Sequence, residues 1–127
     1  MSNKQNEEFV KEGAQNVTEK DVEKVINKSE ELKKKFSATG PLARFIEDGQ
    51  LLISVVKDYR TGTFRQIPFG TIAAIVFTLI YVLNPFDLIP DFLPIIGEID
   101  DAAVVAACLF LIEHDLRKYR DWKLGQV

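Results

Sequence analysis

The stretch from Asn84 to Asp101 reads NPFDLIPDFLPIIGEIDD, and it decides how the chain folds. It holds three prolines, one glycine and five carboxylates between two strongly apolar segments. Proline interrupts a helix because it lacks the backbone N–H and its ring clashes with the preceding turn. The stretch therefore predicts a rigid, non-helical elbow that joins two buried helices.

The segments that flank this elbow predict an apolar helical hairpin over residues 67–116. Residues 66–86 are 21 positions without a formal charge, and the apolar part that follows the elbow, residues 102–112, has 11. A helix that is apolar on all sides is buried, either in a protein core or in lipid. Because a hydrocarbon core of about 30 Å takes about 20 helical residues, the first segment barely reaches across and the second is too short alone.

Charges are segregated along the chain. Residues 1–65 carry 12 Lys and Arg against 11 Asp and Glu, residues 66–116 carry seven acids and no basic residue, and residues 117–127 carry four basic residues against one acid. Folding the hairpin places the flanking cations on one side and the acidic elbow on the other, as the positive-inside rule predicts. These cations are Lys57, Arg60, Arg65, Arg117, Lys118, Arg120 and Lys123, and the aromatic residues among them are Phe64, Tyr119 and Trp122.

Membrane association competes with burial inside a soluble bundle. Gly70 and Ala74, like Ala102 and Ala106, are small residues four apart, which suits close helix packing in lipid. A soluble four-helix bundle with a central third helix accounts for the same apolarity. We favour the membrane. The polar start of the chain has no apolar core of a secretory signal, so we expect the N-terminal half to be cytoplasmic.

The first half of the chain predicts two helices after a disordered tail. Residues 1–17 are polar and offer too few apolar side chains to form a packed element. Thr18 followed by Asp21 is a capping-box-like start, which predicts a helix over residues 18–40. A second helix is expected from Pro41 to about Arg60.

The first of these helices has a narrow apolar seam on a charged rod. The seam residues are Val22, Val25, Ser29, Leu32 and Phe36. We favour packing of this seam on the chain's own bundle. The alternative is that residues 18–37 contact a partner protein or an anionic membrane surface.

Composition excludes several classes of site. At 127 residues the chain is one domain, and its single cysteine, Cys108, excludes an internal disulfide and a cysteine zinc cage. No basic cluster interleaved with aromatic residues is present in the first half, so nucleic-acid binding is not expected. Cys108 lies in an apolar run, which is typical of a small buried hydrophobe. His114 has no nucleophile near it in sequence and is interpreted as a solvated residue.

The carboxylates of the elbow are the constellation with the most chemical potential. Several oxygens without neighbouring cations suit Ca²⁺ or Mg²⁺, although the spacing does not match an EF-hand loop. The candidate cation ligands are Asp87, Asp91, Asp100 and Asp101, and Glu98 lies among them. The alternative, which we favour, is that each Asp caps a turn and that Asp100 caps the last helix.

The segment from Tyr81 to Asp101 resembles the signature of the YkvA-like domain of unknown function. This small bacterial domain also occurs within some eukaryotic membrane-bound RING-type ubiquitin ligases. The resemblance covers roughly residues 50–115. It implies a domain that is commonly labelled a membrane protein, and it implies no catalytic residue. The signature positions are Pro85, Asp87, Pro90, Asp91, Gly97, Asp100 and Asp101.

Together these observations predict an all-α bundle of about four helices, with a YkvA-like helical domain over residues 41–124. We expect a non-enzymatic adaptor or assembly factor that is inserted in the membrane as a hairpin or as a multi-pass protein. It would have no cofactor, and its partners would be lipid and a protein that contacts residues 18–37. The alternative is a soluble helical module that binds a divalent cation through the elbow. A metal-assisted hydrolase is the least favoured hypothesis, because no base, nucleophile or cationic stabiliser accompanies the carboxylates.

Overall fold

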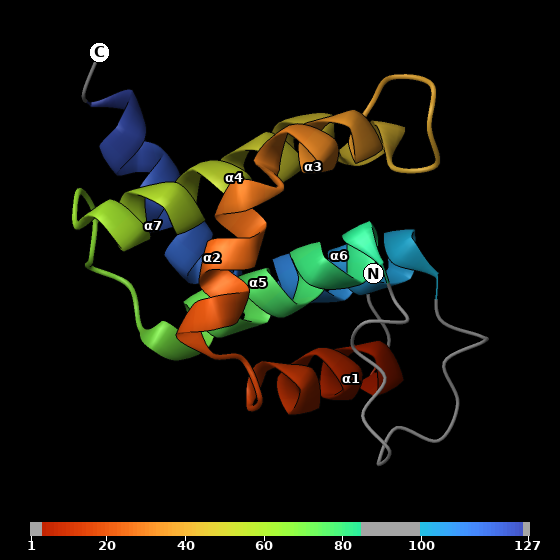
Figure 1. Ribbon diagram of the computed structural model, residues 1–127, viewed down its shortest axis with the longest axis horizontal. Helices are drawn as coiled ribbons and strands as arrows, with labels where there is room; N and C mark the ends of the chain where they lie inside the picture. Colours follow the sequence, from red (N-terminus) through yellow and green to blue (C-terminus); the bar gives the residue numbers. More distant parts are fainter. Residues whose placement is uncertain (1–3, 85–99, 126–127) are drawn as a thin grey trace.

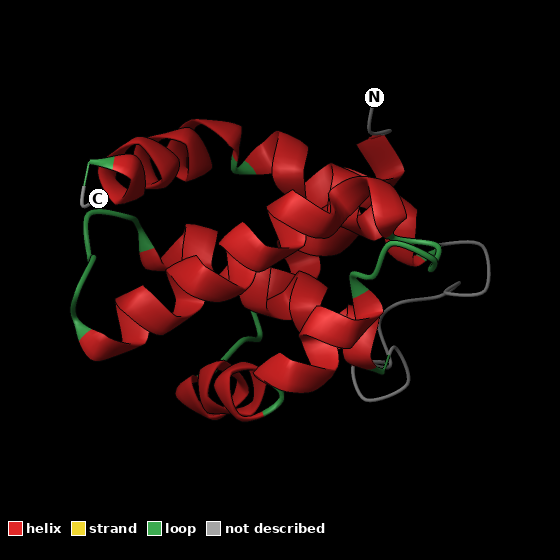
Figure 2. Ribbon diagram, turned by 90° about the horizontal axis from the view of Figure 1, so that it is seen from above, coloured by secondary structure: helices red, strands yellow, loops and turns green. Residues whose placement is uncertain are grey.

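The computed structural model describes residues 4–84 and 100–125. Within these residues the chain forms seven α-helices, one short 3₁₀ helix and no strand (Figure 2). The elements are α1 (Lys4–Ala14), α2 (Glu19–Asn27), α3 (Ser29–Lys35), η1 (Ala43–Phe45), α4 (Ile46–Thr61), α5 (Phe69–Leu83), α6 (Asp101–Leu111) and α7 (Glu113–Leu124). The all-α fold is confirmed. The expected number of about four helices is too low, because two of the expected helices are each divided in two and a further helix precedes them.

Helix α5 is the centre of the molecule. It follows Pro68, its N-cap residue, and every residue from 72 to 82 is buried. Helices α1, α2, α3, α4 and α6 all pack against it, and Figure 1 shows α5 running between α1 and α4. The apolarity of α5 on all sides is therefore matched by protein side chains on all sides.

The expectation that lipid surrounds both arms of the hairpin is wrong for α5. Its 15 residues extend about 22 Å, which is short of a hydrocarbon core of about 30 Å. In the described part of the chain, no helix combines the length and the apolarity needed to cross a bilayer. The predicted transmembrane, multi-pass hairpin thus has no support in the structure.

Residues 4–14 form α1, so the prediction of a disordered tail over residues 1–17 is wrong there. Phe9 is only 6% exposed, and its ring packs edge-on against Phe77 and Tyr81, with centroids 5.2 and 5.5 Å away. A Cβ atom added to Gly13 would lie 2.1 Å from the Phe77 ring, so α1 sits close on α5. The few apolar residues of this segment are enough to order it because they pack against the apolar helix α5.

The helix expected over residues 18–40 is present as α2 and α3, which meet at a bend at Lys28. The Thr18 N–H donates a hydrogen bond of 2.9 Å to the Asp21 carboxylate, so the predicted start is confirmed. At Lys28 the backbone leaves the helical range, with φ −103° and ψ 17°. The seam residues are all buried: Val22, Val25, Ser29, Leu32 and Phe36. The seam therefore packs on the chain's own core.

Helix α4 begins at Ile46 rather than at Pro41, because residues 41–45 form turns and the 3₁₀ helix η1. Inside α4, a Cβ atom at Gly49 would lie 2.4 Å from the Phe36 ring. The absence of a side chain at Gly49 therefore lets the Phe36 ring pack closely against α4.

The last expected helix bends at Ile112, where φ is −107° and ψ is 12°. The Thr71 hydroxyl donates a hydrogen bond of 2.6 Å to Asp115, which holds the start of α7 beside the start of α5. From there α7 packs against α4 as well as α6. Gly70 is exposed with no atom within 4 Å of an added Cβ, so the close contact expected at Gly70 and Ala74 is absent at Gly70.

Candidate functional site

The signature elbow is described only at its end. Asp100 is the N-cap residue of α6, and its carboxylate accepts a hydrogen bond of 2.7 Å from the Ala103 N–H. The predicted capping role of Asp100 is therefore confirmed. The signature residues that lie outside the described residues are Pro85, Asp87, Pro90, Asp91 and Gly97, and Glu98 lies outside them as well.

Asp101 opens α6 and is half-buried. Burial raises the pKa of its carboxyl group; the attraction of Lys35 opposes this rise, and the repulsion of Asp100 adds to it. Among residues 4–84 and 100–125, no three Asp, Glu, His or Cys side chains are grouped to hold a metal ion. The predicted Ca²⁺ or Mg²⁺ site, which also needs Asp87 and Asp91, stays a prediction. Calorimetric titration of each cation, with an Asp91→Asn and Asp101→Asn double variant as control, tests it.

Cys108 and His114 are the other side chains considered for chemistry. Cys108 is fully buried, and its thiol donates to the Ala74 carbonyl at 3.7 Å. Burial raises the pKa of this thiol to about 12, so it stays protonated and unreactive near neutral pH. His114 is exposed in the first turn of α7. Both residues thus lie where the sequence predicts them, one buried and one solvated.

The aromatic residues expected at a membrane interface pack instead on one another. Phe64 and Tyr119 are 3% and 0% exposed, and their ring centroids lie 5.2 Å apart. Trp122 is half-buried, 4.9 Å from Phe64 and stacked on Tyr119 at 5.8 Å. Phe64 and Tyr119 therefore lie inside the protein, and the three rings together fix α7 to the connection between α4 and α5.

A chain of hydrogen bonds next to these rings ties α7 to α4. The Lys123 ammonium donates to the Ser54 hydroxyl at 2.7 Å, and the hydroxyls of Ser54 and Tyr119 are 2.6 Å apart. The Tyr119 hydroxyl in turn donates to Asp58 at 2.5 Å. Burial raises the pKa of Tyr119, and this bond to Asp58 raises it further. Each group has its partner within the protein, so these hydrogen bonds serve as a structural link between α4 and α7.

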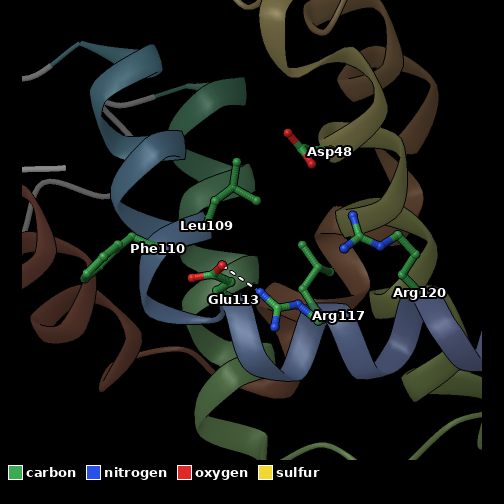
Figure 3. A pocket seen from close by; sticks show the side chains of 7 residues that line it. Asp48, Leu109, Phe110, Glu113, Arg117 and Arg120 are labelled. Carbon is green, nitrogen blue, oxygen red and sulfur yellow. Dashed lines mark hydrogen bonds and ion pairs between the residues drawn. The ribbon is translucent and has the colours of Figure 1, made fainter. Parts of the chain in front are cut away.

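A pocket of about 310 Å³ lies where the start of α4, the end of α6 and α7 meet (Figure 3). Its charged lining residues are Asp48, Glu113, Arg117 and Arg120, and its apolar ones are Leu109, Phe110 and Leu116. Arg117 donates to Glu113 at 2.8 Å. The lining thus combines two guanidinium groups, two carboxylates and three apolar side chains.

The side chains of Asp48 and Arg120 have no hydrogen bond or ion pair among the residues that the structure describes. Figure 3 shows Asp48 extending from α4 and Arg120 extending from α7. Burial raises the pKa of the Asp48 carboxyl group, Arg120 lowers it by attraction, and Glu47 raises it by repulsion. Within the described ranges, Asp48 makes no ion pair closer than 4 Å. Its oxygens remain open to a donor from a ligand.

Sequence reasoning missed this pocket. Arg117 and Arg120 are three residues apart, a spacing that places both on one side of a helix, and this signal was available. In the sequence, however, these two residues are part of a general basic tail. Asp48 comes from α4, far from the two arginines in the sequence, and the folding of the chain brings the three residues to one pocket.

Two large apolar side chains are exposed at one end of the bundle. Phe110 is 55% exposed and Phe69 is 43% exposed. The thiol of Cys108 on α6 contacts Ala74 on α5, which places the end of α6 beside the start of α5. Phe110, at the end of α6, and Phe69, at the start of α5, therefore share that end of the molecule.

Comparison with known proteins finds one family and one curated relative. Residues 71–107, which include most of α5 and the first half of α6, match the family described as "Protein of unknown function (DUF1232)". The chain is 33% identical over 70 residues to the "Uncharacterized membrane protein YkvA" of Bacillus subtilis (strain 168). This match covers 55% of the chain and 66% of the relative, just under two thirds of its length. No solved structure shows significant similarity to the chain.

Proposed function

We propose that this chain, which is similar to the YkvA-like family of DUF1232 proteins, is a non-enzymatic helical module that attaches to a membrane surface without crossing it. The Bacillus subtilis relative is named as a membrane protein. The attachment we propose uses the surface of the bundle, since α5 is enclosed by the other helices.

The observation that carries this proposal is the pair of exposed phenylalanines. Phe69 and Phe110 are 43% and 55% exposed at the same end of the bundle. Arg65, just before α5, and Arg117 and Lys118, on the first turns of α7, are exposed at this end as well. Aromatic rings that enter the acyl boundary beside cations that meet lipid phosphates are the usual elements of interfacial attachment.

The absence of an enzymatic role is part of the proposal. Cys108 is enclosed and His114 is exposed on the surface, and neither lines the pocket between α4, α6 and α7. A reaction needs a nucleophile or base that is positioned against a substrate site.

We propose the adaptor role in a narrower form than the sequence suggests. The apolar seam of residues 18–37 is occupied by the chain's own core. A protein partner would therefore meet the outer face of α2 and α3, where Glu30, Lys33 and Lys34 are exposed. Such a contact is electrostatic and sensitive to salt.

Vesicle flotation tests the membrane attachment. The probe is a vesicle of equal parts phosphatidylcholine, phosphatidylethanolamine and phosphatidylglycerol. The unaltered chain is expected to float with the vesicles, and a Phe69→Ser and Phe110→Ser double variant to lose most of this binding.

The matched control is Leu124→Ser, which removes a side chain that is 67% exposed at the far end of α7. It should float as the unaltered chain does. Failure of the unaltered chain to float, or full flotation of the double variant, contradicts the proposal. Circular dichroism verifies that each variant keeps its helices.

A further inference from the structure

The pocket between α4, α6 and α7 has a charge pattern that suits one class of ligand. Arg117 and Arg120 supply two positive charges, and Asp48 and Glu113 supply two negative charges. The formal charge of the lining is therefore zero, with the opposite charges held on different side chains. A simple anion would meet the carboxylates as well as the guanidinium groups, whereas a zwitterion can meet both signs favourably.

The arginines retain donors for a phosphate group. Arg117 uses one terminal nitrogen in its contact of 2.8 Å with Glu113. Both side chains of this pair are largely exposed, at 59% and 62%, so the pair is weak and exchangeable. A guanidinium group has five N–H donors in a planar fork that matches two oxygens of a phosphate.

Asp48 supplies the opposite half of the pattern. It is half-buried, it extends from α4 while Arg120 extends from α7 (Figure 3), and it makes no ion pair in the described part of the chain. A carboxylate in this setting gains most from a ligand that brings both a positive charge and hydrogen-bond donors. A primary ammonium group brings both, whereas a trimethylammonium group brings only the charge.

We propose that this pocket binds the zwitterionic headgroup of a phosphoethanolamine lipid, with its phosphate on Arg117 and Arg120 and its ammonium on Asp48. This inference rests on the proposed membrane attachment and names the lipid. A cavity of about 310 Å³ is at the small end of the range for ligand sites, which suits a headgroup. Phe110 lines the same pocket and is 55% exposed, so it can meet the acyl chains beyond the headgroup.

Titration of the full chain with soluble glycerophosphoethanolamine, followed by amide NMR shifts, tests the pocket directly. Shifts are expected at the start of α4 and along α7. Glycerophosphocholine, which lacks the N–H donors, and glycerol phosphate, which lacks the ammonium, should bind roughly tenfold more weakly, as expected for one lost charge-assisted hydrogen bond. Equal shifts with all three compounds, or no shifts with any, would overturn the proposal.

Matched variants separate this pocket from the general surface charge. Asp48→Asn and Arg120→Gln should each weaken glycerophosphoethanolamine binding by about tenfold. Asp121→Asn on α7 and Lys20→Gln on α2 remove the same kinds of charge from exposed positions outside the pocket, and they should leave it unchanged. Unchanged binding in both pocket variants would overturn the assignment.

The two proposals fail in different ways. If the chain binds glycerophosphoethanolamine but floats with no vesicle, the membrane attachment is wrong and the pocket stands. The other result is that the chain floats equally with vesicles that contain or lack phosphatidylethanolamine, and that Asp48→Asn changes flotation with neither kind of vesicle. In that case the membrane attachment stands and the headgroup assignment is wrong.

Discussion

Two glycines that share a helical setting differ in what surrounds them. Gly49 in α4 faces the Phe36 ring, where an added Cβ would lie 2.4 Å away, whereas Gly70 in α5 faces open space. We expect Gly49→Ala to lower the free energy of unfolding by about 1–3 kcal/mol through overpacking. Gly70→Ala should leave it unchanged or raise it by up to about 1 kcal/mol through helix propensity.

Urea unfolding of both glycine variants, followed by circular dichroism, makes this comparison. Both changes add the same methyl group in a helix. The difference between their effects on the free energy of unfolding therefore measures the close packing of Phe36, at the end of α3, against α4. An equal effect of the two substitutions would mean that Phe36 does not pack against Gly49 as described.

Cys108 gives a second prediction at the scale of the residue. Burial raises the pKa of its thiol to about 12, so at pH 8 only about 10⁻⁴ of it is thiolate. We expect no reaction with Ellman's reagent in the folded protein and full reaction of one thiol in denaturant. Any slow reaction in buffer should be no faster than the opening of the fold around this residue. Fast labelling without denaturant would show that α5 and α6 do not enclose this residue.

Residues whose role depends on near neighbours were predictable. Asp100 precedes an apolar run and caps it, and Thr18 and Asp21 form the expected start of α2. The position of Asp48 in the pocket was not predictable, because the other lining residues come from α6 and α7. Nothing in the sequence around it marks it as part of a pocket.

At the scale of the element, α1 shows that a small apolar surface is enough to order a helix when that surface packs against another helix, here α5. We expect Phe9→Ala to lower the free energy of unfolding by about 3 kcal/mol, because the ring is 6% exposed and contacts Phe77 and Tyr81. Glu8→Ala, at the adjacent exposed position, should change it by less than about 0.5 kcal/mol.

Thermal or urea unfolding of this pair tests whether α1 belongs to the fold. Proteolysis at Lys4 and Lys11, which lie within α1, provides an independent measurement and should be slow until the whole protein unfolds. If Phe9→Ala is as mild as Glu8→Ala, residues 4–14 contribute nothing to the core.

The types of the elements followed from hydrophobic periodicity, but their ends did not. The seam of residues 22–36 predicted one helix, and the structure bends it at Lys28; the last helix bends likewise at Ile112. Neither position carries proline or glycine, so no local breaker announces the bend. The bends arise because α5 is short and its coverage on several sides requires the chain to change direction.

At the scale of the whole molecule, the sequence left one choice open: lipid or protein around the apolar segment. Local hydropathy could not decide, because both surroundings select the same side chains. The structure places α1, α2, α3, α4 and α6 around α5. The deciding information was distributed over the polar first half of the chain, where scattered apolar residues such as Phe9 and the seam supply the cover.

The enclosed α5 and the exposed Phe69 and Phe110 are the basis of the proposal that the protein attaches to a bilayer from one side. The segment of the elbow from residue 85 to residue 99 lies outside the described residues, and the account does not depend on it.

Membrane fractionation followed by a wash in alkaline carbonate tests this account most directly. The account predicts that the full chain sediments with membranes and that carbonate then releases it to the supernatant. A chain that stays in the washed pellet would contradict it, because that result requires lipid around the apolar hairpin.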